Sequence, residues 1–181
     1  AALVAAFAAL SKMTQEAKNF SEATGQSVAK SFELIKNSYT LTTSQKNLLG
    51  TTQEIAQVQA TIAKHYGRMN MITGDTAVRI VNMGKAFGYG AEVATEVQET
   101  LMETGGASET VAANMQATAV AMIDAMGVAP GKVMQDLAKN GKELARSMAG
   151  NAKQMIKTAA YAAQIGLDIA SMVKMTNGLL K

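Results

Sequence analysis

The chain has 181 residues, of which 48% are hydrophobic, and it contains neither cysteine nor tryptophan. The lack of cysteine excludes a disulfide framework and a thiolate metal site. The formal net charge of +3 conceals an uneven distribution. Residues 1–85 carry nine Lys/Arg and five Asp/Glu, residues 86–131 carry six acids and no base, and residues 132–181 carry eight bases and three acids. Plentiful helix formers, a single proline and no alternating β-branched runs predict an all-α protein.

The first residues are apolar and helix-forming, and the chain begins with Ala1 rather than Met. We therefore expect it to be part of a longer protein. The longest runs without charge, residues 1–11 and 110–123, are shorter than the roughly 18–20 apolar residues that cross a bilayer. We expect no membrane-spanning helix.

Apolar residues spaced three and four apart run through residues 1–73. They are Leu3, Ala6, Leu10, Met13, Ala17 and Phe20, then Val28, Phe32, Ile35 and Tyr39, then Leu48, Ile55, Val58, Ile62 and Met69. This seam has the a/d spacing of a coiled coil, interrupted by a phase reset and a Thr-rich gap. It predicts extended coiled-coil-like helices or a helical hairpin that needs a partner; ordinary amphipathic helices packing within one domain are the alternative. The interface candidates are Leu3, Leu10, Met13, Phe20, Phe32, Ile35, Ile55 and Ile62.

Residues 74–181 predict a second region, built of short helices separated by glycines. The glycines are Gly74, Gly84, Gly88, Gly90, Gly105, Gly106, Gly127, Gly131, Gly141, Gly150, Gly166 and Gly178. Between these predicted breaks the helical runs are short. Asp75, Ser108 and Asp168 are candidate N-caps, and Pro130 suits a first helical position.

Charged residues in this second region fall into two stripes at helical spacing. The acidic stripe is Glu92, Glu96, Glu99 and Glu103; the basic stripe is Lys139, Lys142 and Arg146, with Lys153 and Lys157 if their helices align. Solvated helix faces are one interpretation of the stripes, and a contact between them, within one chain or between protomers, is the other. A carboxylate metal site would normally add a Glu-x-x-His element, which is missing here.

No motif in the chain predicts catalysis. Residues 127–133 (GVAPGKV) lack the spacing and the hydroxyl of a phosphate loop, and residues 88–90 lack the third glycine of a dinucleotide fingerprint. The only histidine, His65, stands at the end of a helical run, where it suits the helix dipole. The basic cluster at residues 64–68 is too short to predict sequence-specific nucleic acid binding. We expect no enzyme activity and no cofactor.

Three phrases in the C-terminal part carry a family resemblance: residues 105–110 (GGASET), 126–140 (MGVAPGKVMQDLAKN) and 159–170 (AAYAAQIGLDIA). They lie in a stretch covering about two-fifths of the chain that resembles the glycine-punctuated helical region of tailed-bacteriophage tape measure proteins. In that family a Gly-Val-x-Pro turn opens a helix that ends near an Asn, and an Ala-rich helix ending in Leu-Gly-Leu follows. Ala129 and Ile165 depart from the residues usual in the family.

The resemblance implies a structural virion protein that lies in the tail tube lumen or at the baseplate. Such proteins are elongated homo-oligomers that set tail length during assembly and leave during genome ejection. Their partners would be copies of the chain and the tail tube, baseplate hub or tail-tip proteins, with transient host membrane contact as a further option. The apolar seams would supply affinity, and the charge stripes would set register.

Two other functions remain open from the sequence. One is a membrane-active helical protein, such as a pore former or translocator, whose Ala- and Met-rich helices rearrange in a bilayer. The other is an enzyme whose catalytic residues lie in a part of the protein outside these residues.

Overall fold

The computed structural model describes residues 2–25, 27–44, 49–67, 72–148 and 150–179. Within these ranges the chain forms nine α-helices and no strand, and 83% of the chain is helical. The all-α prediction is therefore confirmed. The coiled coil and the oligomer stay predictions.

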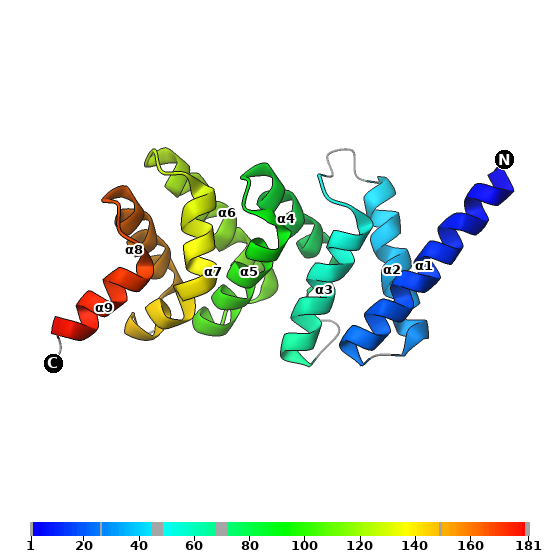
Figure 1. Cartoon of the computed structure of the whole chain (residues 1–181), viewed down its shortest axis with the longest axis horizontal. Helices are drawn as coiled ribbons and strands as arrows, with labels where there is room; N and C mark the ends of the chain where they lie inside the picture. The colour runs from blue at the N-terminus through cyan, green and yellow to red at the C-terminus, as the bar shows by residue number, and fades with distance from the viewer. Residues whose placement is uncertain (1, 26, 45–48, 68–71, 149, 180–181) are drawn as a thin grey trace. The chain divides into compact units, whose positions relative to one another are not determined.

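Figure 1 shows the helices in chain order, coloured from blue at α1 to red at α9. Their bounds are α1 Ala2–Thr24, α2 Val28–Ser44, α3 Thr52–Tyr66, α4 Gly74–Ala86, α5 Gly90–Gly105, α6 Glu109–Ala125, α7 Pro130–Ser147, α8 Ala152–Gln164 and α9 Ile169–Leu179. The chain divides into two compact units, Ala1–Asn82 and Met83–Lys181. This division falls inside α4, whereas the sequence placed the boundary before that helix, after residue 73.

In the first unit, α1, α2 and α3 pack against one another. Their shared core is small: Ala17 and Phe20 of α1 meet Ile35 of α2 and Ala56 of α3. A capping box starts α3, because the Thr51 side chain accepts from the Glu54 amide while the Glu54 carboxylate accepts from the Thr51 amide. The seam thus packs in part within the chain, in a compact three-helix arrangement.

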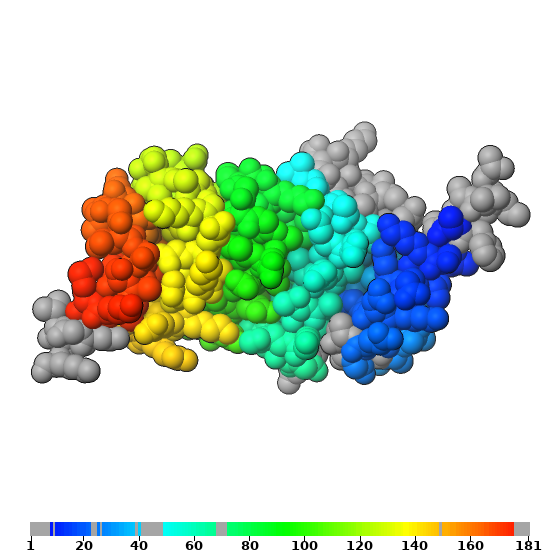
Figure 2. Space-filling model, in the orientation of Figure 1, coloured from blue at the N-terminus to red at the C-terminus, as the bar shows by residue number. Residues whose placement is uncertain are grey.

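In the second unit, α7 is the central helix and packs against α5, α6, α8 and α9. Figure 2 shows α7 in yellow on the visible face of this unit, with α8 in orange and α9 in red beside it. Its amphipathic face buries Met134, Leu137 and Leu144, each at most 2% exposed. The short helices of this unit therefore share one core around α7.

Two turns of the second unit have the same construction. After α6, the amides of Gly127 and Val128 donate to the Asp124 and Ile123 carbonyls; after α8, Gly166 and Leu167 donate to Ala163 and Ala162. This is the Schellman pattern, which needs a left-handed residue after the cap, and Gly127 (φ 71°) and Gly166 (φ 79°) supply it. The next helix starts at once, through Pro130 in α7 and through Asp168, which accepts from the Ser171 amide at 2.6 Å before α9. The predicted roles of Pro130 and Asp168 are confirmed.

Ser108 also caps its helix as predicted, since it accepts from the Val111 amide before α6. Other predictions were wrong. Asp75 lies inside the first turn of α4, where the Thr73 hydroxyl accepts from the Thr76 amide instead. Gly131 and Gly178 lie within α7 and α9. Gly84 and Gly141 likewise do not break helices but lie within α4 and α7.

At both of these glycines the missing side chain permits a close approach. A Cβ at Gly141 would lie 2.9 Å from the Thr100 methyl group of α5. A Cβ at Gly84 would overlap the Gly90 carbonyl. These glycines therefore allow neighbouring backbones to pack closely, and sequence spacing alone does not distinguish this role from that of a turn.

Candidate functional site

The first candidate site is a groove in the N-terminal unit, which we call the α1–α3 groove; it has a volume of about 410 Å³. Its apolar floor consists of Phe20, Ile35, Ala56 and Ala60. Its polar rim consists of Glu16, Asn19, Gln53, Gln57, Thr61 and Lys64. An apolar floor with amide side chains on the rim suits a helix or peptide, which needs both burial and hydrogen bonds.

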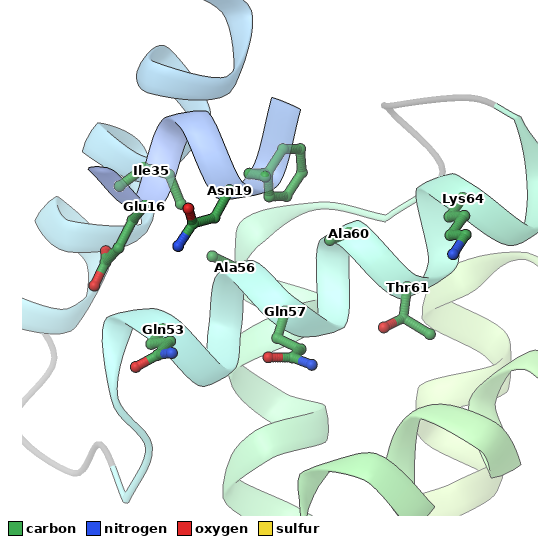
Figure 3. A pocket seen from close by; sticks show the side chains of 10 residues that line it. Glu16, Asn19, Ile35, Gln53, Ala56, Gln57, Ala60, Thr61 and Lys64 are labelled. Atoms are coloured by element: carbon green, nitrogen blue, oxygen red, sulfur yellow. The ribbon is translucent and has the colours of Figure 1, made fainter. Parts of the chain in front are cut away.

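The close-up in Figure 3 shows the rim of this groove from α3. Gln53, Gln57, Thr61 and Lys64 follow one another at three- and four-residue steps, so they line one side of that helix. Asn19 points from α1 toward Ala56 across the groove. Glu16 lies at the end near Gln53, and Lys64 lies at the other end, so the two charges of the rim are separated along its length.

The predicted interface residues fall into three environments. Phe20, Ile35, Ile55 and Ile62 are buried, with at most 5% of their surface exposed, and Met13 and Phe32 are half-buried. Leu10, on the same seam of α1, is 51% exposed. The side chain of Leu3 lies outside the described residues. The seam is thus covered near the C-terminal end of α1 and uncovered at Leu10.

A second groove lies in the C-terminal unit between α6 and α8, and we call it the α6–α8 groove; its volume is about 340 Å³. From α6 it is lined chiefly by Val111, Met115, Ala119 and Met122. From α8 come Ile156 and, as the only charged residues of its lining among the described residues, Lys153 and Lys157. This groove is apolar along its length and positively charged along one side.

The two charge stripes meet at one point. Lys142 Nζ of α7 lies 2.9 Å from Glu103 Oε2 at the end of α5, so the predicted contact between stripes exists within the chain. Glu99 is 8% exposed and belongs to the buried side of α5, whereas Glu92, Glu96, Lys139 and Arg146 are exposed. Lys153 and Lys157 belong to α8, which is separate from α7, so the basic stripe is not continuous. Whether the stripes set register stays a prediction.

The titratable groups of the described residues form no reactive cluster. No group of three His, Cys, Asp or Glu able to hold a metal ion occurs in the described ranges. His65 is exposed in the last turn of α3, with its ring edge-on to Tyr66 at a centroid distance of 5.0 Å. Burial raises the pKa of the Tyr89 hydroxyl well above its usual value, and hydrogen bonds from Ser171 lower the pKa of Asp168. The Asp168 carboxylate serves as a helix cap.

Several polar residues that the sequence did not single out hold the C-terminal unit together. Asp136 of α7 accepts from the Ile169 amide at 2.6 Å, so it caps the first turn of α9 from a distant helix. Gln98 of α5 donates to the Glu109 carbonyl at 2.8 Å, and Gln116 of α6 donates to the Ala94 carbonyl at 2.7 Å. The polar side chains look like solvent-facing residues in the sequence, because their partners lie on other helices.

No helix in the described part of the chain is both long enough and apolar enough to span a bilayer. A scan against protein-family models found no match, and searches of curated proteins and of solved structures found no match either.

Proposed function

We propose that this chain is a structural component of a phage tail, a part of a tape measure protein that works by helix association. Its partners in this proposal are copies of itself and the tail tube, baseplate or tail-tip proteins, and it lies in the tail lumen or at the baseplate. It carries no enzyme activity and needs no cofactor.

The observation that carries the proposal is the incomplete cover of the α1 seam. Helix α1 has 23 residues and its neighbours α2 and α3 have 17 and 15. At 1.5 Å per residue, α1 is about 9 Å longer than α2 and about 12 Å longer than α3. Figure 1 shows α1 extending beyond the helices that cover its C-terminal part. Leu10 is left 51% exposed, while Ala17 and Phe20 on the same seam are buried.

An apolar seam that continues past its own partners favours association with another helix. Exposing Leu10 to water forfeits much of the roughly 1.5–3 kcal/mol gained when a leucine is fully buried. A helix from another chain that continued along α1 would recover this free energy. The amide-lined α1–α3 groove lies on the same three helices and would give such a helix hydrogen-bonding partners.

The resemblance to tape measure proteins supports the location in a tail. Its two most characteristic phrases coincide with the two Schellman turns, at Gly127 before α7 and at Gly166 before α9. The two phrases therefore share one local structure in this chain, in which a glycine turn leads directly into a new helix. A role in helix association, without enzyme activity, agrees with a chain built of such helices.

Tail length tests the proposal directly. In the virus that encodes the chain, an in-frame duplication of this 181-residue segment is expected to lengthen the tail. The increase has an upper bound of about 270 Å, which corresponds to a continuous helix at 1.5 Å per residue. Electron microscopy of purified virions gives the lengths, and a duplication in a capsid protein gene is the control. Unchanged tail length in virions that contain the longer protein would contradict the tape measure function.

The membrane-active alternative has its own test. Liposomes loaded with a self-quenching dye and mixed with the purified chain should stay intact if the role is structural. Rapid leakage at nanomolar protein, together with unchanged tail length in the duplication experiment, would favour the membrane-active function instead.

A further inference from the structure

We infer that the α6–α8 groove is the docking site for an amphipathic helix of a partner protein, with acidic residues along one edge of that helix. This inference concerns the C-terminal unit and does not depend on a location in a phage tail. The length, the polarity and the charge of the groove all fit such a helix.

The groove has the dimensions of a helix site. Its residues on α6 are Val111, Met115, Ala119 and Met122, which recur at intervals of four, four and three and so form one line along the helix. From Val111 to Met122 this line is about 16 Å long, or three helical turns. An apolar groove of three turns matches the i, i+3, i+4 and i+7 anchors of an amphipathic helix.

The groove is apolar and accessible. Val111 is 44% exposed, and Met115 and Met122 are half-buried. Exposed valine together with flexible methionines forms a surface that can adapt to apolar side chains of a partner. The sugar–phosphate backbone of a nucleic acid offers no such side chains, so the floor disfavours a nucleic acid as the occupant.

The charge of the rim specifies which helix fits. Lys153 and Lys157 stand one turn apart on α8, both exposed, and neither forms an ion pair with any described residue. No acidic residue lines the groove within the described part of the chain. Carboxylates spaced four residues apart on a docked helix would lie opposite the two ammonium groups. A basic helix would meet repulsion without compensation, so the rim discriminates by charge.

The surface that surrounds the rim supports the same conclusion. Tyr161 follows Lys157 by four residues on α8, and Ile165 is the residue at which that helix ends; they are 60% and 71% exposed. Both lie outside the lining of the groove and offer further apolar surface near the C-terminal end of α8. Tyrosine is enriched in protein interfaces because it combines large contact area with a polar end.

Two synthetic helical peptides of about 15 residues test the inference. Both carry leucines at i, i+3, i+4 and i+7; one has glutamates and the other lysines along one edge. Fluorescence anisotropy with the full 181-residue chain should show binding of the glutamate peptide at low salt and at least tenfold weaker binding of the lysine peptide. The affinity for the glutamate peptide should fall as salt is raised, because exposed charges are screened.

Variants then locate the binding. The double substitution Lys153→Glu and Lys157→Glu changes only exposed side chains and should reverse the preference between the two peptides. Val111→Gln should weaken both peptides at least fivefold without altering the preference. Circular dichroism checks that each variant is folded. Lys139→Glu, an exposed charge change on α7, is the matched control and should leave both affinities unchanged.

Three results would overturn the inference. The first is that the glutamate peptide fails to bind, or binds wild type and the double variant equally. The second is a dimer in sedimentation that the double variant dissociates, which would make a second copy the occupant. The third is binding of anionic phosphatidylglycerol vesicles through the two lysines without binding of the peptide, which would make a membrane surface the ligand. A groove that binds the glutamate peptide in a chain whose duplication leaves tail length unchanged would keep this inference and refute the tail function.

Discussion

The two units of the chain use helices in different ways. The N-terminal unit has long helices of unequal length, so part of the α1 seam extends beyond its neighbours and Leu10 remains exposed. The C-terminal unit has helices of 11 to 18 residues whose packing centres on α7, and it buries Leu101, Ile123, Leu137 and Leu144 almost completely. In the first unit the apolar surface left for a partner is the side of one overlong helix, α1. In the second unit the helices cover one another around α7, and the apolar surface that remains is the α6–α8 groove.

The largest expected effect comes from one core truncation in each unit. Phe20→Ala removes the aromatic ring from the small first core and should reduce the free energy of unfolding by about 3–5 kcal/mol. Leu144→Ala should reduce it by about 2–5 kcal/mol in the second unit. Hydrogen exchange should show faster exchange only in α1–α3 for the first variant and only in α5–α9 for the second.

Leu10→Ala is the matched control for these truncations. Because Leu10 is 51% exposed, its truncation should change the stability of the isolated chain by no more than about 0.5 kcal/mol. Loss of protection in both units from either core variant would show a single cooperative structure and remove the basis of the comparison.

The next effect concerns two glycine turns of the C-terminal unit, which connect α7 to α8 and α8 to α9. Gly150 has φ of +76°, and a Cβ there would lie 2.6 Å from the Thr104 carbonyl oxygen. Gly166 has φ of +79° with nothing within 4 Å of such a Cβ. Gly166→Ala should therefore cost only the left-handed strain of about 1–2 kcal/mol. Gly150→Ala should cost about 1–3 kcal/mol more, from the clash with Thr104.

Thermal unfolding of the two glycine variants measures this difference. Equal losses at both positions would mean that the turn after α7 moves away from α5 without cost. In that case the turn at Gly150 would be packed less tightly against the end of α5 than the 2.6 Å distance to the Thr104 oxygen implies.

A smaller effect concerns how α9 is held. Asp136→Ala removes the charged acceptor of the Ile169 amide and should cost about 1.5–3 kcal/mol, the usual range for a hydrogen bond to a charged group. Asp136→Asn keeps an acceptor oxygen and should lose less. Because Ile169 is fully buried, hydrogen exchange at the start of α9 should report the change. Equal exchange in all three proteins would show that Asp168 alone is a sufficient cap.

Much of the local structure could be predicted from the sequence. These predictions depend on residues that lie close together in the sequence, so the sequence pattern itself indicates them. They are the all-α class, the caps at Ser108 and Asp168, the start of α7 at Pro130 and the glycine turns at Gly127 and Gly166. The spacing of Phe20 and Ile35 placed them on an apolar seam and left open whether a partner or the same domain covers it; within the chain both are buried.

The rest required knowledge of which helices meet. A glycine such as Gly141 predicts a helix break in the sequence. In the structure it lies within α7 and makes room for Thr100 of α5, which lies opposite it. Asp136 looks like a solvated residue until α9 is placed with Ile169 beside it. The α6–α8 groove combines α6 methionines with α8 lysines that are more than 30 residues apart along the chain. No periodicity within one helix contains such pairings, so the docking site could not be predicted from the sequence.

The smallest expected effect tests whether the charge stripes contribute to stability. A double-mutant cycle with Glu103→Gln and Lys142→Met should give a coupling of about 0.2–1 kcal/mol, because both side chains are partly exposed to solvent. The coupling should almost vanish in 1 M salt, where the screening length is about 3 Å. The same cycle on Glu96 and Lys139, which form no ion pair with the described residues, should give none. A coupling at the second pair as large as at the first would mean that the stripes attract as extended surfaces. Such an extended attraction could fix the register of a partner helix, whereas the expected single coupling at Glu103 and Lys142 only holds α5 against α7 within the chain.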